Sequence, residues 1–413
     1  MSNQTNSATL SSWRCLTNAQ LAKDIHRKET ALHSRRTKAT GKGGRRQSQL
    51  AALARLFVFG LAALLATTAA NSAQAASQLA FPRPAALEPN INFWLDVFSG
   101  YSERDFVILD RDQVWKIYQV LHLPGEGTPS PADVEWANSY LKLKWGEVLH
   151  RLAAGAEPVG PQERIAAKLF AGEPPSAYEA AAQNLRVQQG LREQFRAAIL
   201  RSRNYSSTME RIFRTAGLPV ELTMLPHVES GFNNTSRSSA GAVGIWQFTR
   251  STGKQYDLKI TRRMDQRLDP YRETEAAAKL LRYNYEVLGN WPLAITAYNY
   301  GTYGMTRAAE SCTSDFCSIL RRFNGPHFGF ASKNYYAEFL AALQIHSYES
   351  AYFPGIADEP TPPPQAVRVM LPPPSRSRDH HGGKRIAGSP RRTHHKHRQA
   401  QTARKAKTAT PPA

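Results

Sequence analysis

The sequence predicts a mainly α-helical protein, and three observations lead to this fold class. From Asn90 to Glu349, apolar residues recur at the three- and four-residue spacing of amphipathic helices far more often than they alternate. Pro and Gly separate these segments, as expected where helices begin and end. The 413 residues are 41% hydrophobic, which is enough for one large core or two modest ones. Collagen-like and wholly disordered proteins are therefore excluded.

The formal net charge of +20 is concentrated at the two ends of the chain. Residues 1–75 carry 11 basic and 2 acidic side chains, residues 360–413 carry 12 and 1, and the segment between them is neutral with 30 of each. A protein that docks on a nucleic-acid duplex normally carries its Lys and Arg on the folded domain. We therefore expect no nucleic-acid partner.

The first 75 residues are interpreted as an export segment with a long polar lead. An apolar run over residues 56–70 follows Arg55 and precedes Ala73-Gln74-Ala75, which has the small-x-small form of a signal-peptidase site. The run is shorter than the about 20 residues that a membrane span needs. We expect cleavage after Ala75 and a periplasmic protein, with an uncleaved membrane anchor as the alternative.

Residues 76–204 are predicted to form a helical amino-terminal region in which no catalytic chemistry is evident. A turn at residues 172–175 is expected to precede a long amphipathic helix from Ala177 to Arg203. Two apolar stripes are expected earlier, one made of Phe93, Trp94, Val97 and Phe98, the other beginning with Trp136, Tyr140 and Leu143.

Glu229 is the candidate acid of the second region, residues 205–352. Leu218, Leu222, Leu225 and Glu229 lie at positions i, i+4, i+7 and i+11, and eleven residues of α-helix return to within about 20° of the start. A carboxyl group on an apolar stripe is partly buried, which raises its pKa and lets it give a proton to a leaving oxygen near neutral pH. The alternative is a solvated Glu at a helix end.

The segment from Ser238 to Phe248 follows Glu229 and combines small residues with aromatic and amide side chains. Small residues let a backbone approach a ligand closely. The rings of Trp246 and Phe248 are of a kind that stacks on sugars, and Gln247 offers both a donor and an acceptor. The alternative is a tight turn with a core Trp.

Taken in order, these motifs resemble those of lytic transglycosylases with a soluble-lytic-transglycosylase catalytic domain. The matching stretches are Glu229-Ser230-x-Phe232, Ser238-x-Ala240-Gly241-Ala242-x-Gly244-x-Trp246-Gln247-Phe248, Thr252-Gly253 and Ala297-Tyr298-Asn299-x-Gly301. The segment from Gly329 to Leu340 is similar to the membrane-bound lytic murein transglycosylase D group in particular. The resemblance implies a lysozyme-like fold over residues 205–352 and action on peptidoglycan glycan strands, with no cofactor and no metal.

By this resemblance Glu229 is the sole catalytic acid and base. It would protonate the oxygen between N-acetylmuramic acid and N-acetylglucosamine, and then take a proton from the muramoyl 6-hydroxyl as the 1,6-anhydro ring closes. The resemblance also implies substrate-binding roles for Ser238, Gln247, Thr249, Tyr298, Asn299 and Tyr335. Thr249 stands where many members have Met.

Two other functions are weighed against this one. A hydrolytic muramidase needs a second carboxyl in the cleft, for which Asp257, Asp265 and Asp269 are the nearest downstream candidates. Asp269 before Pro270 is better explained as the N-cap of a helix running to Leu288. A non-catalytic cell-wall-binding protein would hold glycan without an acid such as Glu229.

Two features outside the candidate site complete the expectations. Cys312 and Cys317 are the two cysteines of the exported part, and a local disulfide is favoured over two reduced thiols, with a metal site least favoured. Residues 353–413 are expected to form a Pro-rich, basic, disordered tail that contains almost no large apolar side chain. Such a tail is either simply solvated or adheres to anionic cell-wall or membrane surfaces.

Overall fold

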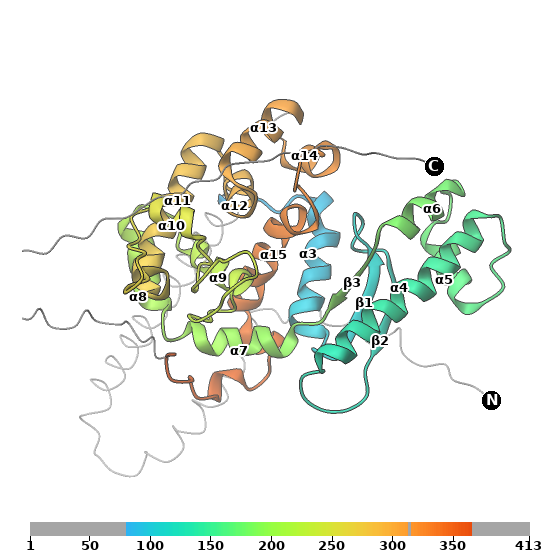
Figure 1. Ribbon diagram of the computed structural model, residues 1–413, viewed down its shortest axis with the longest axis horizontal. Coiled ribbons are helices and arrows are strands. Elements are labelled where there is room, and N and C mark those ends of the chain that lie inside the picture. The colour runs from blue at the N-terminus through green and yellow to red at the C-terminus, as the bar shows by residue number, and fades with distance from the viewer. Residues whose placement is uncertain (1–79, 313–314, 366–413) are drawn as a thin grey trace, which may run out of the picture. The chain divides into compact units, whose positions relative to one another are not determined.

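The computed structural model describes residues 80–312 and 315–365, and most of these residues lie in helices (Figure 1). The predicted mainly α fold is thereby confirmed. The expected export segment, residues 1–75, and the basic part of the expected tail lie outside the described residues. Within the described part of the chain, no helix combines the length and the apolar character needed to cross a membrane.

A three-stranded antiparallel sheet interrupts the helices of the amino-terminal region, and the sequence analysis did not predict it. β1 (Asp105–Asp110) lies between β2 (Ile117–His122) and β3 (Leu185–Gln189). The single long helix expected over residues 177–203 is therefore wrong. The chain forms α6 (Ser176–Gln183), then β3, then α7 (Arg192–Ser202), because the backbone of β3 pairs with β1 along its length.

β1 is buried on both faces and joins the sheet to the rest of the protein. Phe106 and Ile108 pack in one apolar cluster with α4 (Pro131–Ala153), whereas Val107 and Leu109 pack in the main core with α3 (Glu88–Leu95). All four side chains are fully buried. A central strand covered on both sides reads as a continuous apolar run rather than an alternating one.

Of the two apolar stripes expected here, one is confirmed and one is wrong. The first is buried across α3 and the π-helical turn η2 (Asp96–Gly100). On α4, however, Trp136, Tyr140 and Leu143 are 54%, 38% and 67% exposed. The α4 face that packs on the sheet is instead formed by Ala137, Leu141, Trp145, Val148 and Leu149. The remaining elements of this region are η1 (Ala85–Leu87) and α5 (Pro161–Leu169).

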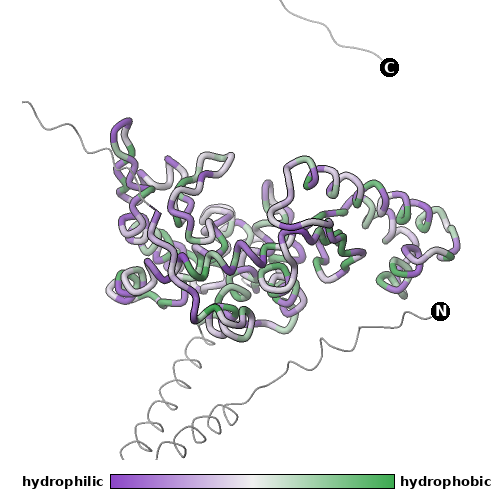
Figure 2. Tube along the Cα trace, turned by 90° about the horizontal axis from the view of Figure 1, so that it is seen from below, coloured by the Kyte–Doolittle hydropathy of each residue, from purple (hydrophilic) through white to green (hydrophobic). Residues whose placement is uncertain are grey.

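The second region is built from helices around the long helix α15. Its elements are α8 (Ser206–Thr215), η3 (Val220–Met224), α9 (Leu225–Glu229), α10 (Arg250–Gln255), η4 (Gln266–Leu268), α11 (Pro270–Leu288), α12 (Trp291–Tyr300), α13 (Thr302–Cys312), α14 (Phe316–Arg322), α15 (Phe330–Ser347), α16 (Glu349–Tyr352) and η5 (Ile356–Asp358). α15 packs against α3, α9 and α12 (Figure 1). Apolar and polar residues alternate along the helical turns in Figure 2, as expected for helices that each bury one face.

The helix predicted to end at Leu288 is confirmed together with its caps. Asp269 accepts hydrogen bonds from the backbone N–H groups of Tyr271 and Arg272 at 3.0 and 3.1 Å. Gly289 ends the helix in the left-handed conformation, with φ +76°. This helix, α11, packs against α12, which carries two of the expected site residues.

The expected disulfide between Cys312 and Cys317 is wrong, because both sulfurs are free. Cys312 ends α13, whereas Cys317 lies in the first turn of α14, so two separate helices hold the two side chains. The hydroxyl of Ser311 lies 3.8 Å from the Cys312 sulfur.

The boundary expected for the tail at residue 353 lies too early in the sequence. Phe353 and Ile356 are buried in the main core. Arg203 donates hydrogen bonds to the carbonyls of Ile356 and Glu359, and Asn204 donates one to the carbonyl of Pro362. These contacts hold the chain against the end of α7 through at least residue 362.

Candidate active site

Glu229 is the last residue of α9, and the local sequence explains why the helix ends there. Pro226 occupies the first turn of α9, where its missing N–H is not needed. Gly231 and Phe232 both take the left-handed conformation, with φ +58° and +56°, which stops the helix. A 3₁₀ turn followed by α9 replaces the single α-helix expected here, but Leu222 and Leu225 are still buried and Glu229 is half-buried.

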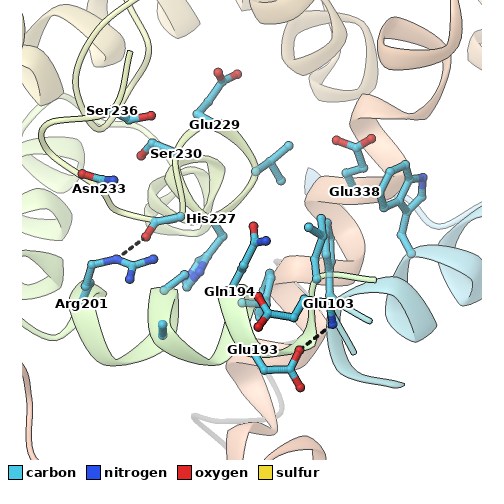
Figure 3. Close-up of a pocket in the computed structure, with 18 of the residues that line it drawn as sticks. Glu103, Glu193, Gln194, Arg201, His227, Glu229, Ser230, Asn233, Ser236 and Glu338 are labelled. Carbon is cyan, nitrogen blue, oxygen red and sulfur yellow. Dashed lines mark hydrogen bonds between the residues drawn. The ribbon is translucent and has the colours of Figure 1, made fainter. Parts of the chain in front are cut away.

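The Glu229 carboxyl lines a cavity of about 740 Å³ that also reaches residues of α7 and of the sheet (Figure 3). The Tyr335 hydroxyl on α15 donates a hydrogen bond to Glu229 Oε1. Burial raises the pKa of Glu229 from 4.5 to about 7, and the hydrogen bond from Tyr335 opposes this by favouring the charged form. A carboxyl with this pKa can both release and accept a proton near neutral pH.

The loop between α9 and α10 is fixed on the side that faces Glu229 by two hydroxyl groups. Ser230 Oγ donates to the carbonyl of Ile245 at 2.8 Å, and Tyr298 Oη donates to the carbonyl of Trp246 at 2.9 Å. Gln247 takes a left-handed conformation, with φ +53°, at the turn of this loop. Burial, followed by the nearby charge of Glu229, raises the pKa of Tyr298 well above its ordinary value, so Tyr298 stays neutral.

A buried carboxyl that was not singled out from the sequence lies against this loop, and neither of its oxygens has a hydrogen-bond partner in the described part of the chain. Glu273 on α11 is fully buried, and burial raises its pKa well above the ordinary value, although the backbone N–H groups of residues 245, 246 and 248 and the charge of Arg267 oppose the shift. A Cβ on Gly244 would lie 1.9 Å from the Arg267 carbonyl oxygen and 2.4 Å from Glu273. Position 244 therefore needs glycine because the protein itself fills the space beside it. The sequence had suggested that a small residue here lets the backbone approach a ligand.

The two aromatic residues expected to stack on sugars belong to the core. Trp246 and Phe248 are 0% and 2% exposed. Trp246 stacks on Phe213 with ring centroids 5.6 Å apart, and its Nε1 donates to Thr274 Oγ1 at 2.9 Å. A sugar ring cannot reach either face, so the core-Trp alternative is the correct one.

The expected substrate-binding residues fall into two groups. Tyr335 contacts Glu229, and Gln247 Nε2 donates to the Gly244 carbonyl at 2.8 Å and lies 3.4 Å from the carbonyl of Ser236, a cavity-lining residue. Ser238 and Thr249 instead line a second cavity of about 770 Å³, which Glu229 does not line.

Local hydrogen bonds engage the polar side chains of Ser238, Thr249 and Asn299. The Thr249 hydroxyl caps α10 by accepting from the Thr252 N–H at 3.2 Å. The Ser238 hydroxyl accepts from the Ala242 N–H at 3.0 Å. Asn299 is exposed, and its Oδ1 accepts from Ser332 Oγ at 2.8 Å. The structure therefore does not bring these three side chains into contact with Glu229.

None of the three acids considered for a muramidase lines the cavity of Glu229. Asp265 pairs with Arg267 at 2.7 Å, and Asp257 pairs with Lys279 at 2.7 Å. Asp269 caps α11, as described above. The muramidase alternative therefore does not obtain its second carboxyl from any of these three candidates.

Three further carboxyl groups line the cavity, those of Glu103, Glu193 and Glu338, and none of them was singled out from the sequence. Glu338 on α15 lines the same cavity as Glu229, and Figure 3 shows the two side chains projecting from two different elements. Burial, and then the charge of Glu229, raise the pKa of Glu338 to about 8, while Arg186 opposes the shift. The three-residue spacing from Tyr335 places Glu338 on the same helix face and is the signal that could have found it.

His227 is a second missed residue in the cavity wall. It is buried, stacks on Phe195 with ring centroids 4.9 Å apart, and neither ring nitrogen has a hydrogen-bond partner in the described part of the chain. Burial lowers the pKa of His227 well below its ordinary value, with the nearby His346 and Arg201 adding to the effect. His227 therefore stays neutral beside Glu229.

Comparison with known proteins points to one family for the part of the chain that carries Glu229. Residues 210–314 match the Transglycosylase SLT domain family. Membrane-bound lytic murein transglycosylase D of Escherichia coli (strain K12) is 37% identical over 126 residues, which are 29% of this chain and 28% of that protein. A putative tributyltin chloride resistance protein of Alteromonas sp. (strain M-1) is 36% identical over 95 residues, 23% of this chain and 46% of that protein.

Two solved structures are also similar in part. An inactive mutant of the lytic transglycosylase Slt from Pseudomonas aeruginosa matches with a TM-score of 0.29 and 19% identity, over 37% of this chain and 25% of that chain. The 70 kDa soluble lytic transglycosylase of Escherichia coli matches with a TM-score of 0.29 and 21% identity, over 35% of this chain and 24% of that chain.

The family match covers Glu229, Gln247 and Tyr298 but ends before Tyr335 and Glu338. The chain spans less than half the length of each of the curated relatives named above. The resemblance inferred from the motifs is confirmed over residues 210–314, which match the Transglycosylase SLT domain family.

Proposed function

We propose that this protein is a peptidoglycan lytic transglycosylase in which Glu229 is the catalytic acid and base. It cleaves the β-1,4 bond between N-acetylmuramic acid and N-acetylglucosamine and leaves a 1,6-anhydromuramoyl end. The observation that carries the proposal is a half-buried carboxyl, held by Tyr335 in a cavity of about 740 Å³, whose pKa is raised to about 7. The SLT domain match and the similarity to lytic murein transglycosylase D support it.

A single group suffices for both proton transfers of this reaction. Protonated Glu229 gives its proton to the bridging oxygen as the bond from that oxygen to the muramoyl C1 breaks. The N-acetyl carbonyl of the substrate stabilises the positive charge that develops at C1. The 6-hydroxyl oxygen then bonds to C1 and its proton returns to Glu229, so that no water is consumed. A pKa near 7 suits a group that must be an acid in one step and a base in the next.

The rest of the protein takes its roles from this reaction. Residues 205–352 form the catalytic domain, and residues 76–204 supply one wall of the cavity. Gln247, Tyr298 and Tyr335 shape the cleft at the cleaved bond, whereas Ser238, Thr249 and Asn299 contact sugars further along the strand. The chain is exported to the periplasm, and its basic carboxyl-terminal segment contacts anionic cell-wall or membrane surfaces.

Glu338 makes a hydrolytic muramidase the second candidate function, because a second carboxyl lines the cavity of Glu229. Its protonation state argues against this function. Burial and the charge of Glu229 raise the pKa of Glu338 to about 8, so it holds its proton at neutral pH. A protonated carboxyl can neither activate water nor act as a nucleophile, and the ring-closing reaction is therefore favoured.

Digestion of purified sacculi by the full chain separates the two functions. The lytic reaction gives muropeptides that end in anhydromuramic acid, each lighter by one water than the reducing-end product of a muramidase. Mass spectrometry of the digest is the measurement, and Glu229→Gln should abolish release while circular dichroism stays unchanged. Release of reducing-end products alone would contradict the proposal.

A further inference from the structure

Glu338 is a cavity-lining carboxyl that the proposed mechanism leaves unused. No hydrogen bond or ion pair joins its carboxyl to any other group in residues 80–312 and 315–365, although the side chain is half-buried. The neighbouring cation, Arg186 on β3, lies over the ring of Phe330 instead, 3.6 Å from its centroid. A half-buried carboxyl without a protein partner has its hydrogen-bonding capacity free for a ligand.

Three other polar side chains close to Glu229 are already engaged in hydrogen bonds. Ser230 Oγ donates to the Ile245 carbonyl, Tyr335 Oη donates to Glu229, and Arg201 Nε donates to the Gly231 carbonyl. Glu338 lies on α15 one turn beyond Tyr335 and lines the cavity from this helix, whereas Glu229 lines it from α9 (Figure 3). A substrate carbonyl in this part of the cavity requires a donor, because a carbonyl oxygen only accepts.

The surroundings of Glu338 favour its neutral form. Burial disfavours the charged carboxylate, and the charge of Glu229 across the cavity adds to this, whereas Arg186 alone acts in the opposite direction. The titratable groups on the elements packed against α15 are Glu229 and His227 on α9, Tyr298 and Tyr300 on α12, Asp96 on η2, Glu221 on η3, Glu349 and Tyr352 on α16, and Glu88 on α3, which is paired with Arg83.

We propose that Glu338 binds the substrate as a neutral carboxylic acid, donating a hydrogen bond to a carbonyl oxygen of an N-acetyl or lactyl-amide group in the cleft. This inference rests on the proposed function, because it assumes that a glycan of this class occupies the cavity. Glu338 is then a specificity-determining residue: it selects sugars that carry an acyl carbonyl at this place, and it takes no part in the proton transfers of Glu229.

Two substitutions distinguish a hydrogen-bond donor from a base at position 338. Glu338→Gln keeps a neutral donor of nearly the same shape, whereas Glu338→Leu removes the donor and keeps the bulk. For the full chain acting on sacculi near pH 6.5, Glu338→Leu should raise KM about tenfold with little change in kcat, and Glu338→Gln should retain at least about a third of kcat/KM. Glu310→Leu, an exposed change on α13, is the matched control.

Binding without turnover tests the inference independently of the chemistry. The probe is chitotetraose, titrated calorimetrically into the full chain carrying Glu229→Gln, alone or with each Glu338 substitution. Adding Glu338→Leu should weaken binding about tenfold. Binding by Glu229→Gln alone should weaken between pH 6 and pH 9 as Glu338 loses its proton, whereas the variant that also carries Glu338→Gln should be insensitive to pH over this range.

The outcomes separate failure of the inference from failure of the proposed function. Equal affinity of all three variants, no measurable binding, or the same pH dependence with Glu338→Gln would overturn the role of Glu338. The role would also be overturned if Glu338→Gln lost activity as completely as Glu229→Gln does. Such a loss would indicate that Glu338 acts as a base. Absence of anhydro ends from the wild-type digest would overturn the proposed function alone.

Discussion

Replacing Glu229 by Gln should stabilise the folded protein at alkaline pH, although it removes the catalytic group. The folded state holds the Glu229 proton up to about pH 7, whereas the unfolded chain releases it near the ordinary value of 4.5. The unfolded state therefore binds fewer protons between these values, and stability falls as the pH rises through this window. Gln does not titrate in this range, so the variant does not lose stability as the pH rises through this window.

The size of the effect follows from the same pKa. A rise from 4.5 to about 7 corresponds to about 3 kcal/mol of lost stability above pH 7. Weakening the hydrogen bond from Tyr335 costs about 1 kcal/mol. Glu229→Gln should therefore raise the free energy of unfolding by about 2 kcal/mol at pH 8.5 and lower it slightly at pH 4.

Urea denaturation of wild type and variant at both pH values measures these differences directly. Glu310→Gln, at an exposed position, should change neither free energy by more than about 0.5 kcal/mol. If Glu229→Gln destabilised the protein equally at pH 4 and pH 8.5, the carboxyl would not be held in a charge-disfavouring environment, and the argument for its catalytic role would fail.

Two further changes probe the groups around Glu229. Tyr335→Phe removes the hydrogen bond that favours the charged carboxylate, so the alkaline limb of the pH–rate profile should move upward by about one pH unit, and a downward shift would contradict this assignment. Gly244→Ala brings a methyl group to 1.9 Å from the carbonyl oxygen of Arg267 and should lower the free energy of unfolding by at least about 2 kcal/mol in urea. Gly241→Ala, where the new methyl group meets nothing within 4 Å, should cost only the backbone strain of its φ of +79°, and an equal loss for both changes would exclude the clash as the cause.

The sequence predicted well those features that depend on neighbouring residues. The cap of α11 at Asp269 and its stop at Gly289 follow from local rules, and the structure has both. The motifs around Glu229 predicted the resemblance to lytic transglycosylases, and the match of residues 210–314 to the Transglycosylase SLT domain family confirms it. The buried stripe of α3 and η2 was correctly read from its spacing.

Features set by distant partners were missed. β3 is a strand because β1, about 80 residues earlier in the chain, offers its backbone, and nothing within residues 185–189 announces that pairing. The face that α4 buries depends on where the sheet lies, so Trp136 was assigned to the wrong side. Glu338 shares the cavity of Glu229 only because α15 packs against α9, and a carboxyl within a helical sequence is ordinarily interpreted as solvated.

The burial of β1 on both faces limits how small a fragment can keep the cavity around Glu229 intact. The segment that matches the SLT family lacks Tyr335, Glu338 and the α7 wall, and the strand that anchors that wall shares its side chains between two cores. Excising residues 210–314 would therefore leave Glu229 on an open surface, with water in place of the groups that keep it protonated. The smallest fragment that keeps all of these groups is the whole span from α3 to α16.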